Sequence, residues 1–170
     1  AGPIAGVPVG GASTSEPGRS VLTGGQNGIH AGCCESRPAE PSGDVFGDAN
    51  NNGVYDTGES HIPGTTGIVL DAIGTQVAQQ ATNADGFYKF SGLSLGNYTI
   101  VEVQPAGWLD GKDSAGKIGG VTVGQADNPG DKIRNVNLLW GDVGVHYDFG
   151  ELKPASIAGR VFFDPNEDCL

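Results

Sequence analysis

Residues Asp48 to Glu59 read D-A-N-N-N-G-V-Y-D-T-G-E, and this stretch decides how the rest of the chain is interpreted. Side-chain oxygens fall at its positions 1, 3, 5, 9 and 12, and its sixth residue is Gly53. The spacing matches the calcium-loop pattern D-x-[DN]-x-[DN]-G followed by five residues and a glutamate. The predicted ligands are the side chains of Asp48, Asn50, Asn52, Asp56 and Glu59 and the backbone carbonyl of Val54.

Three of these predicted ligands are carboxylates, which repel one another at short range when no cation lies between them. The ordered loop is therefore expected to depend on the ion. The alternative is a plain hairpin turn, because Asn-Gly is a strong hairpin signal. A plain turn does not need acidic residues at positions 1, 9 and 12, so the pattern favours calcium.

The flanking residues argue against an EF-hand, in which helices would border the loop. Pro63 and Gly64 follow the loop closely, and both residue types break helices. The preceding residues 44–47 are short and β-leaning. The loop is therefore predicted to connect two strands.

The composition favours strands and turns over helices. The chain has 170 residues, of which 30 are glycine, 7% are aromatic and none is methionine. A net charge of −11 argues against nucleic acid as a partner, because phosphate binding requires a basic surface. The sequence contains no apolar run long enough for a membrane span and no recognisable signal peptide at Ala1, as expected for a processed or excised fragment.

The three cysteines leave two interpretations open. Cys33 or Cys34 could form a disulfide with Cys169, or the thiols could be isolated in the terminal segments. Because the number is odd, at least one thiol is free or pairs with another chain.

The chain divides into three parts. Residues 1–42 are rich in Gly, Pro and Ser and are predicted to form a linker or arm. Strand-length segments separated by turn residues follow from residue 43 to residue 155 and predict a two-sheet sandwich. The predicted strands are 44–47, 67–71, 76–81, 87–90, 97–103, 119–123, 133–139 and 143–149.

Residues 156–170 repeat the beginning of the domain. Ser156 to Asp168 resembles the segment 43–52, and aligning Asp164 with Asp48 gives a spacing of 116 residues, the difference between 164 and 48. The second copy has oxygen ligands at positions 1, 3 and 5 but lacks positions 9 and 12. We interpret residues 156–170 as the first strand and partial calcium loop of a following repeat.

Four motifs in order resemble the B domains of serine-aspartate-repeat surface proteins (SdrD B-like), within the wider collagen-adhesin Cna B-type group. They are G-D-V-F-G-D-A-N-N-N-G-V-Y-D-T-G-E, T-N-A-D-G-F-Y-K-F-S-G-L, G-N-Y-T-I-V-E-V-Q-P-A-G-W-L-D-G-K-D-S-A-G and Y-D-F-G-E-L-K-P-A-S-I-A-G-R-V-F. The resemblance implies an all-β Greek-key β-sandwich of prealbumin-like or immunoglobulin-like topology with about seven strands. It also implies a secreted, calcium-stiffened spacer.

The resemblance further implies a second calcium site in the loops. Its candidate ligands are Asp110 and Asp113, with Asp127, Asp131 and Asp142 as helpers. The alternative is that these aspartates belong to solvated turns.

Some Cna B-type domains form a Lys–Asn isopeptide bond assisted by a glutamate, and Glu102 matches the position of that glutamate. Residues 44–47 contain no lysine to supply the amine, so no cross-link is expected. Glu102 is interpreted as a buried or edge carboxylate that makes hydrogen bonds.

The leading functional prediction is a non-catalytic structural module, stabilised by calcium, in an extracellular or cell-surface protein. The alternative is an adhesion module that binds carbohydrate or protein through aromatic side chains; the candidates are Trp108, Trp140, Tyr55 and Tyr147. An enzyme is not expected, because His30, His61 and His146 lie in unrelated contexts and form no catalytic pattern.

The predicted partners are neighbouring repeats of the same kind, in cis or in trans. Apolar residues of segment 156–163 would pair with the edge of a neighbouring sheet; they are Ile157, Val161, Phe162 and Phe163.

Overall fold

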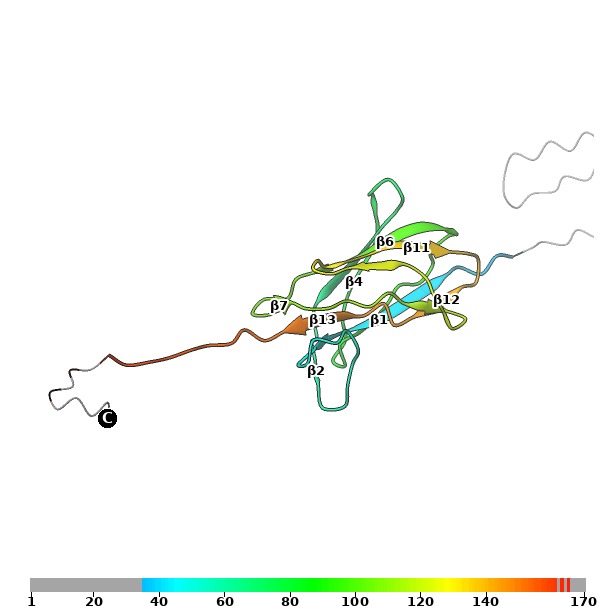
Figure 1. Cartoon of the computed structure of the whole chain (residues 1–170). Helices are drawn as coiled ribbons and strands as arrows, with labels where there is room; N and C mark the ends of the chain where they lie inside the picture. Colours follow the sequence, from blue (N-terminus) through cyan, green and yellow to red (C-terminus); the bar gives the residue numbers. More distant parts are fainter. Residues whose placement is uncertain (1–34, 162, 164, 166–170) are drawn as a thin grey trace, which may run out of the picture. The chain divides into compact units, whose positions relative to one another are not determined.

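The computed structural model describes residues 35–161, 163 and 165. These residues form thirteen strands in two sheets (Figure 1), so the predicted all-β sandwich is confirmed. In the same residues no helix is long and apolar enough to cross a membrane. The three cysteines, His30 and the partial loop at Asp164, Asn166 and Asp168 lie outside the described residues.

The first sheet has the strand order β7-β13-β1-β12-β8-β9, and β2 and β5 also pair with β1. Its strands are β1 (Glu40–Gly47), β2 (Ser60–His61), β5 (Phe87–Lys89), β7 (Leu109–Asp110), β8 (Lys117–Ile118), β9 (Val121–Thr122), β12 (Val143–Val145) and β13 (Phe149–Leu152). β12 and β13 both run parallel to β1, the former along its beginning and the latter along its end. The first and last strands of the domain are therefore neighbours.

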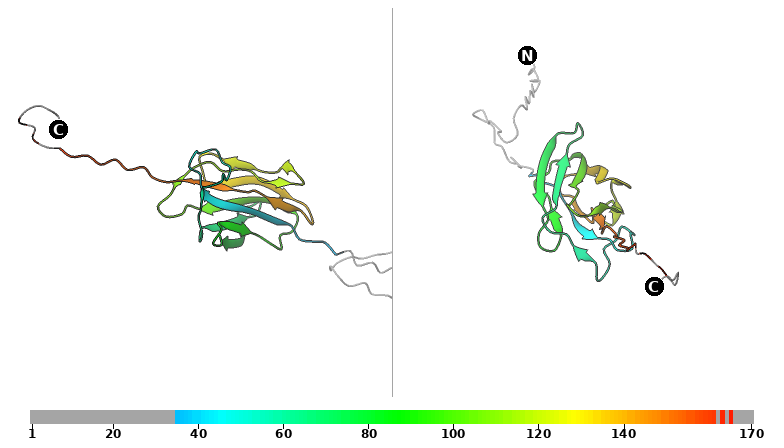
Figure 2. Two further views of the ribbon diagram at one scale, coloured as in Figure 1. Left: turned by 90° about the horizontal axis from the view of Figure 1, so that it is seen from below. Right: turned by 90° about the vertical axis from the view of Figure 1, so that its left-hand side faces the viewer.

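The second sheet is antiparallel and has the order β10-β11-β6-β3-β4. Its strands are β3 (Thr66–Leu70), β4 (Gln76–Ala81), β6 (Gly96–Val103), β10 (Gln125–Asp127) and β11 (Lys132–Leu138). Figure 2 gives the arrangement of the strands from two further directions.

Alternating residues of the strands point into the core. In the predicted strand 87–90, Tyr88 and Phe90 are buried while Phe87 and Lys89 are exposed, as the period of two requires. The core is built from both sheets by Ala39, Val45, Ile62, Val69, Tyr88, Phe90, Leu93, Tyr98, Ile100, Ile133, Val136, Leu138, Tyr147 and Phe149. The Tyr88 hydroxyl donates a hydrogen bond of 2.5 Å to the carbonyl of Tyr147, which satisfies the one polar atom of a fully buried ring.

Two predicted strands were wrong in extent. The segment 119–123 is not one strand, because Gly119 and Gly120 have φ of 57° and 84° and form the turn between β8 and β9. The segment 143–149 is interrupted at His146, whose φ is 61°, and divides into β12 and β13.

β1 begins at Glu40, four residues before the predicted start at Asp44. Pro41 and Gly43 concealed this extension in the sequence. Gly43 is required there, since a Cβ at this position would lie 1.9 Å from the carbonyl oxygen of Tyr147. The strands β2, β7, β8 and β10 were missed because two or three residues carry no measurable period.

Candidate metal sites

The loop 48–59 winds around the carboxylate of Asp48, which follows β1 directly and is fully buried. Asp48 Oδ1 accepts a hydrogen bond of 3.0 Å from the backbone N–H of Asn52, and Oδ2 accepts one of 2.6 Å from that of Gly53. Asn51 and Gly53 have φ of 54° and 78°, which produces the sharp turn expected at Gly53. The loop is thus closed on its first acidic residue.

The remaining predicted ligands meet across the loop. Asn50 Nδ2 and Asn52 Nδ2 each lie 2.9 Å from Asp56 Oδ2. Glu59 accepts hydrogen bonds from the backbone N–H groups of Ala49 and Asp56, both at 2.9 Å. The oxygens of the two amides face the backbone of the loop: Asn50 Oδ1 accepts a hydrogen bond of 3.1 Å from the N–H of Asn52, and Asn52 Oδ1 accepts one of 2.7 Å from the N–H of Val54. The loop is thus tied together by Asp56 and Glu59, but among the described residues the carboxylates of Asp48, Asp56 and Glu59 do not form a group whose ligand oxygens all lie within 4.8 Å of one another.

A second group of carboxylates lies beside this loop. Its members come from both sheets and the connections between them: Glu102 in β6, Asp110 in β7, Asp113 after β7, Asp131 before β11 and Glu151 in β13. Ligand oxygens of Glu102, Asp131 and Glu151 all lie within 4.8 Å of one another. Glu102 is 3% exposed, Asp113 5% and Glu151 1%. We call these five residues the carboxylate cluster.

The carboxylate cluster contains buried oxygens that have no hydrogen-bond partner. They are Glu102 Oε1 and Oε2, Asp110 Oδ1, Asp113 Oδ1 and Oδ2, Asp131 Oδ1 and Glu151 Oε1. No lysine or arginine within residues 35–161 forms an ion pair with the cluster. Buried charges without partners are costly, so an isolated group of this kind must gain protons or a cation.

The pKa values of the cluster point the same way. Burial, reinforced by Glu151, raises the pKa of Glu102 strongly, and burial together with Asp110 raises the pKa of Asp113 to about 9. Burial also raises the pKa of Asp131 and of Glu151. In the absence of a cation, burial therefore favours the protonated form of Glu102, which can share its proton with Glu151.

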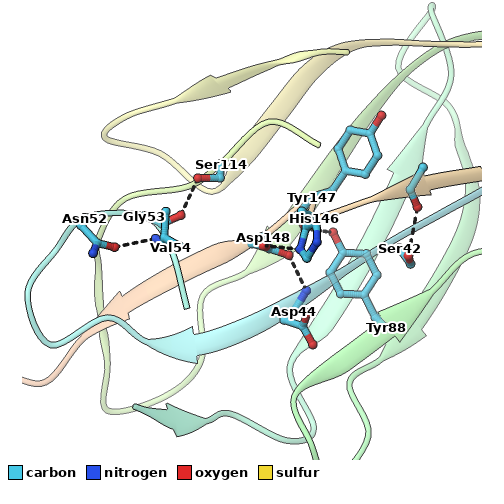
Figure 3. A network of polar contacts seen from close by, with 11 residues as sticks. Ser42, Asp44, Asn52, Gly53, Val54, Tyr88, Ser114, His146, Tyr147 and Asp148 are labelled. Carbon is cyan, nitrogen blue, oxygen red and sulfur yellow. Dashed lines mark hydrogen bonds and ion pairs between the residues drawn. The ribbon is translucent and has the colours of Figure 1, made fainter. Parts of the chain in front are cut away.

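The loop and the carboxylate cluster are in direct contact. The backbone N–H of Asp48 donates a hydrogen bond of 2.8 Å to the carbonyl of Glu151. The hydroxyl of Ser114, next to Asp113, donates one of 2.5 Å to the carbonyl of Gly53 (Figure 3). Because of these two hydrogen bonds, ordering of the loop 48–59 restricts the backbone beside the carboxylate cluster, and ordering of the cluster restricts the loop.

Comparison with known proteins identifies the family. The SdrD B-like domain family matches residues 42–151. The chain belongs to the SdrD B-like domain family. It is 30% identical over 135 residues to serine-aspartate repeat-containing protein F of Staphylococcus epidermidis, covering 78% of this chain and 7% of that protein. It is 36% identical over 91 residues to serine-aspartate repeat-containing protein D of Staphylococcus aureus (strain Newman), covering 52% of this chain and 7% of that protein.

The SdrD B-like chain therefore spans a small fraction of the length of these curated relatives. A solved structure described as the Bacillus anthracis TIE protein matches 68% of this chain and 18% of its own, with a TM-score of 0.41 and 16% sequence identity.

Within this SdrD B-like domain, the structure brings three of the five predicted second-site residues together, namely Asp110, Asp113 and Asp131. Asp127 lies apart and accepts hydrogen bonds of 2.9 and 2.6 Å from the guanidinium of Arg134. Asp142 accepts one of 2.8 Å from the backbone N–H of Leu139 in the turn before β12.

Glu102 and Glu151 were not among the predicted ligands. Glu102 is buried, as expected. Among the described residues no N–H or hydroxyl group reaches its oxygens, and its hydrogen-bond partner is the carboxyl group of Glu151. The alternation of residues along β6 indicates that the side chain of Glu102 is buried, because Tyr98, Ile100 and Glu102 share one face of the strand and the first two are apolar. A glutamate on a buried face requires a partner, and in the absence of lysine or arginine that partner is a proton or a metal.

The aromatic side chains proposed for ligand stacking are mostly used within the domain. Tyr147 is fully buried, and Tyr55 packs edge-on against Phe46 with 5.6 Å between ring centroids. Lys153 Nζ lies 5.4 Å from the ring centroid of Trp108. Trp140 is 47% exposed. The interpretation of Tyr147 as a stacking surface is wrong, because its ring fills the space left by Gly116 and Gly144.

Proposed function

We propose that this SdrD B-like domain is a non-catalytic spacer module of an extracellular or cell-surface protein, and that bound calcium holds it rigid. The observation that carries the proposal is the carboxylate cluster. Five acidic side chains that lie together without a positively charged partner destabilise the folded state strongly unless a cation neutralises them. Outside the cell, millimolar calcium is available to sites as weak as about 10⁻⁴ to 10⁻³ M.

The residues fit calcium in number and kind. Calcium takes six to eight oxygen ligands, often from bidentate carboxylates. In the first proposed site, the ligands are Asp48, Asn50, Asn52, Asp56, Glu59 and the Val54 carbonyl. In the second, they are the members of the carboxylate cluster, whose partnerless oxygens supply enough donors for one ion.

The position of the cluster explains how an ion would stiffen the fold. Glu102 belongs to the second sheet, whereas Asp110 and Glu151 belong to the first. An ion held by all three would join the two layers of the sandwich at one end. The loop ion would in turn fix the connection from β1 to β2, and the Asp48–Glu151 hydrogen bond couples the two sites.

Counting bound ions tests this proposal directly. We expect native mass spectrometry of the full chain to find two calcium ions. Asp48→Asn and Asp113→Asn should each lose one, since each change removes a charged ligand from one site. Asp127→Asn is the matched control, because that aspartate pairs with Arg134, and it should retain both ions. A wild-type chain without calcium, or an Asp113→Asn chain that keeps two ions, would contradict the assignment.

We also propose that neighbouring repeats are the partners of this module. The relatives are named for serine-aspartate repeats, and the cell-surface location comes from the same resemblance. In the described tail, residues 153–161 form no strand, and Ile157, Val161 and Phe163 are almost fully exposed. Exposed apolar residues of this kind can add a strand to a neighbouring sheet edge.

Deleting residues 156–170 is expected to abolish any concentration-dependent self-association of the chain. Analytical ultracentrifugation over a range of concentrations measures this. A chain in which Ile157 and Val161 are replaced by serine provides a second variant of full length with the same expected result. Identical sedimentation of all three chains would reject strand pairing through the tail.

A further inference from the structure

A third group of ligand atoms lies elsewhere along β1, on residues that neither proposed calcium site uses. Asp44 in β1 and His146 and Asp148 in the connection from β12 to β13 bring one ligand atom each within 4.8 Å of one another. Figure 3 shows the imidazole of His146 beside the carboxylate of Asp148, with Asp44 next to them. Asp148 is 6% exposed, whereas His146 lies at the surface.

An irregularity in the sheet creates this group. β1 pairs Pro41 with Gly144 and then Val45 with Phe149, so four steps along β1 correspond to five along its partner. The extra residue makes a bulge, and His146 adopts a φ of 61° within it. Bulges change the direction of side chains and are frequent near functional sites. Here Tyr147 enters the core while His146 and Asp148 are left beside Asp44.

The spacing of the three side chains suits a small metal ion. Asp148 Oδ1 accepts a hydrogen bond of 2.9 Å from the backbone N–H of Asp44, which fixes the carboxylate. Its Oδ2 lies 3.5 Å from His146 Nδ1, which is long for a hydrogen bond. It is close to the separation of about 3.3 Å between two ligands of a tetrahedral zinc ion with bonds of about 2.0–2.1 Å. No protein donor among residues 35–161 binds the carboxylate of Asp44.

We propose that Asp44, His146 and Asp148 form a site for a transition-metal dication of the zinc type. The ligands are a carboxylate oxygen of Asp44, Nδ1 of His146 and Oδ2 of Asp148, and water completes the coordination. The imidazole selects against calcium and magnesium, which prefer oxygen, and in favour of zinc and similar ions. His61, the other described histidine, lies near enough to lower the pKa of Asp44 but contributes no atom to the group of three. Its ring stacks on Tyr55 with 4.8 Å between centroids, and its Nε2 lies 3.2 Å from the Tyr55 hydroxyl.

This site would join β1 to the segment between β12 and β13, at the bulge where their pairing is irregular. It is independent of the calcium proposal, because it shares no ligand with either calcium site and differs in chemistry.

Isothermal titration calorimetry with Zn²⁺ tests the proposal by measuring the affinity and the number of bound zinc ions. The full chain is used with Cys33, Cys34 and Cys169 replaced by serine in every variant, and in excess calcium, so that neither thiols nor the oxygen-rich sites compete. The key variant is His146→Asn, since asparagine tolerates a positive φ better than alanine does. Asp44→Asn removes a second ligand, and His61→Ala is the control that keeps the proposed ligands intact.

We expect one zinc ion to bind the parent chain and the His61→Ala chain with similar affinity. His146→Asn and Asp44→Asn should each weaken binding by more than the roughly 10–100-fold that loss of an outer-shell partner costs. Binding of Co²⁺ should give visible absorption bands that disappear in the same two variants. If zinc fails to bind the parent chain, or binds His146→Asn equally well, the site is refuted. If His61→Ala abolishes binding while His146→Asn does not, the ligand assignment is refuted.

Discussion

Removal of calcium by a chelator is expected to lower the melting temperature of this domain by about 20 °C at neutral pH. An ion that binds only the folded state adds about 2.7 kcal/mol at a hundred times its dissociation constant, and for a domain of this size each kcal/mol corresponds to roughly 4 °C. Two proposed sites therefore give about 20 °C. The contact between Asp48 and Glu151 makes the loss cooperative, because disorder at one site releases the backbone of the other.

The fall in melting temperature on removal of calcium should become larger as the pH rises. Burial raises the folded-state pKa of Glu102 strongly and that of Asp113 to about 9, above their values in the unfolded chain. In chelator, protonation of these groups contributes stability that is fully present below the unfolded pKa values and is lost as pH rises toward the folded ones. The calcium-free domain should therefore become less stable between about pH 4 and pH 9. Calcium needs the ionised carboxylates, so its stabilising effect should increase over the same range.

Differential scanning calorimetry at pH 5.5 and pH 8, each with calcium or with chelator, measures both effects. The difference in melting temperature should be smaller at pH 5.5 than at pH 8, because the carboxylates with raised pKa values belong to the cluster site. Magnesium at equal concentration is the control cation, since it demands a smaller octahedral site and dehydrates reluctantly. An unchanged midpoint on chelation, or a difference that narrows as pH rises, would contradict the calcium proposal.

Glu102→Gln is expected to have opposite effects with and without calcium. In chelator, the amide replaces a buried carboxyl group with one that donates a hydrogen bond to Glu151 without needing a proton. At pH 8 this should stabilise the domain by about 1–3 kcal/mol, because folding no longer requires the side chain to take up a proton that the unfolded chain has released at this pH. In calcium, the variant lacks a charged ligand of the cluster, and most of the stabilisation by the second ion should disappear.

Chemical denaturation at pH 8 in calcium and in chelator gives the four free energies of unfolding that this test requires. Asp127 is a surface carboxylate that pairs with Arg134. The Asp127→Asn change should therefore alter the free energy of unfolding only slightly, and by the same amount in calcium and in chelator. A merely structural role for Glu102 predicts destabilisation in both conditions. That outcome would remove Glu102 from the metal site and leave the loop site unaffected.

Much of the fold could be predicted from the sequence because alternation and turn residues are local properties. A period of two places Tyr88 and Phe90 on the same face of the predicted strand 87–90, and the motif places a sharp turn at Gly53. The division of 143–149 could not be predicted in this way. Its cause is the pairing of two segments with β1, about a hundred residues earlier in the chain, at registers that differ by one residue.

The candidate sites also differ in whether their residues are close in the sequence or are brought together only by the fold. The six predicted loop ligands lie within twelve residues, so their spacing alone was enough to predict them. The carboxylate cluster is assembled from four strands or their ends, and aspartates in polar turns gave no means of separating Asp131 from Asp127. Glu151 carried no signal at all, since its burial follows from the position of β13 beside β1.

The parallel pairing of β1 with β13 has a mechanical consequence. The chain enters the domain at the start of β1 and leaves it at the end of β13, and parallel neighbours place these two points at opposite ends of the pair. Tension applied through a tandem array would therefore load the hydrogen bonds between the two strands in shear, all at once, rather than opening them one after another. A module joined in this way can transmit pulling forces along its axis while its neighbours remain in line.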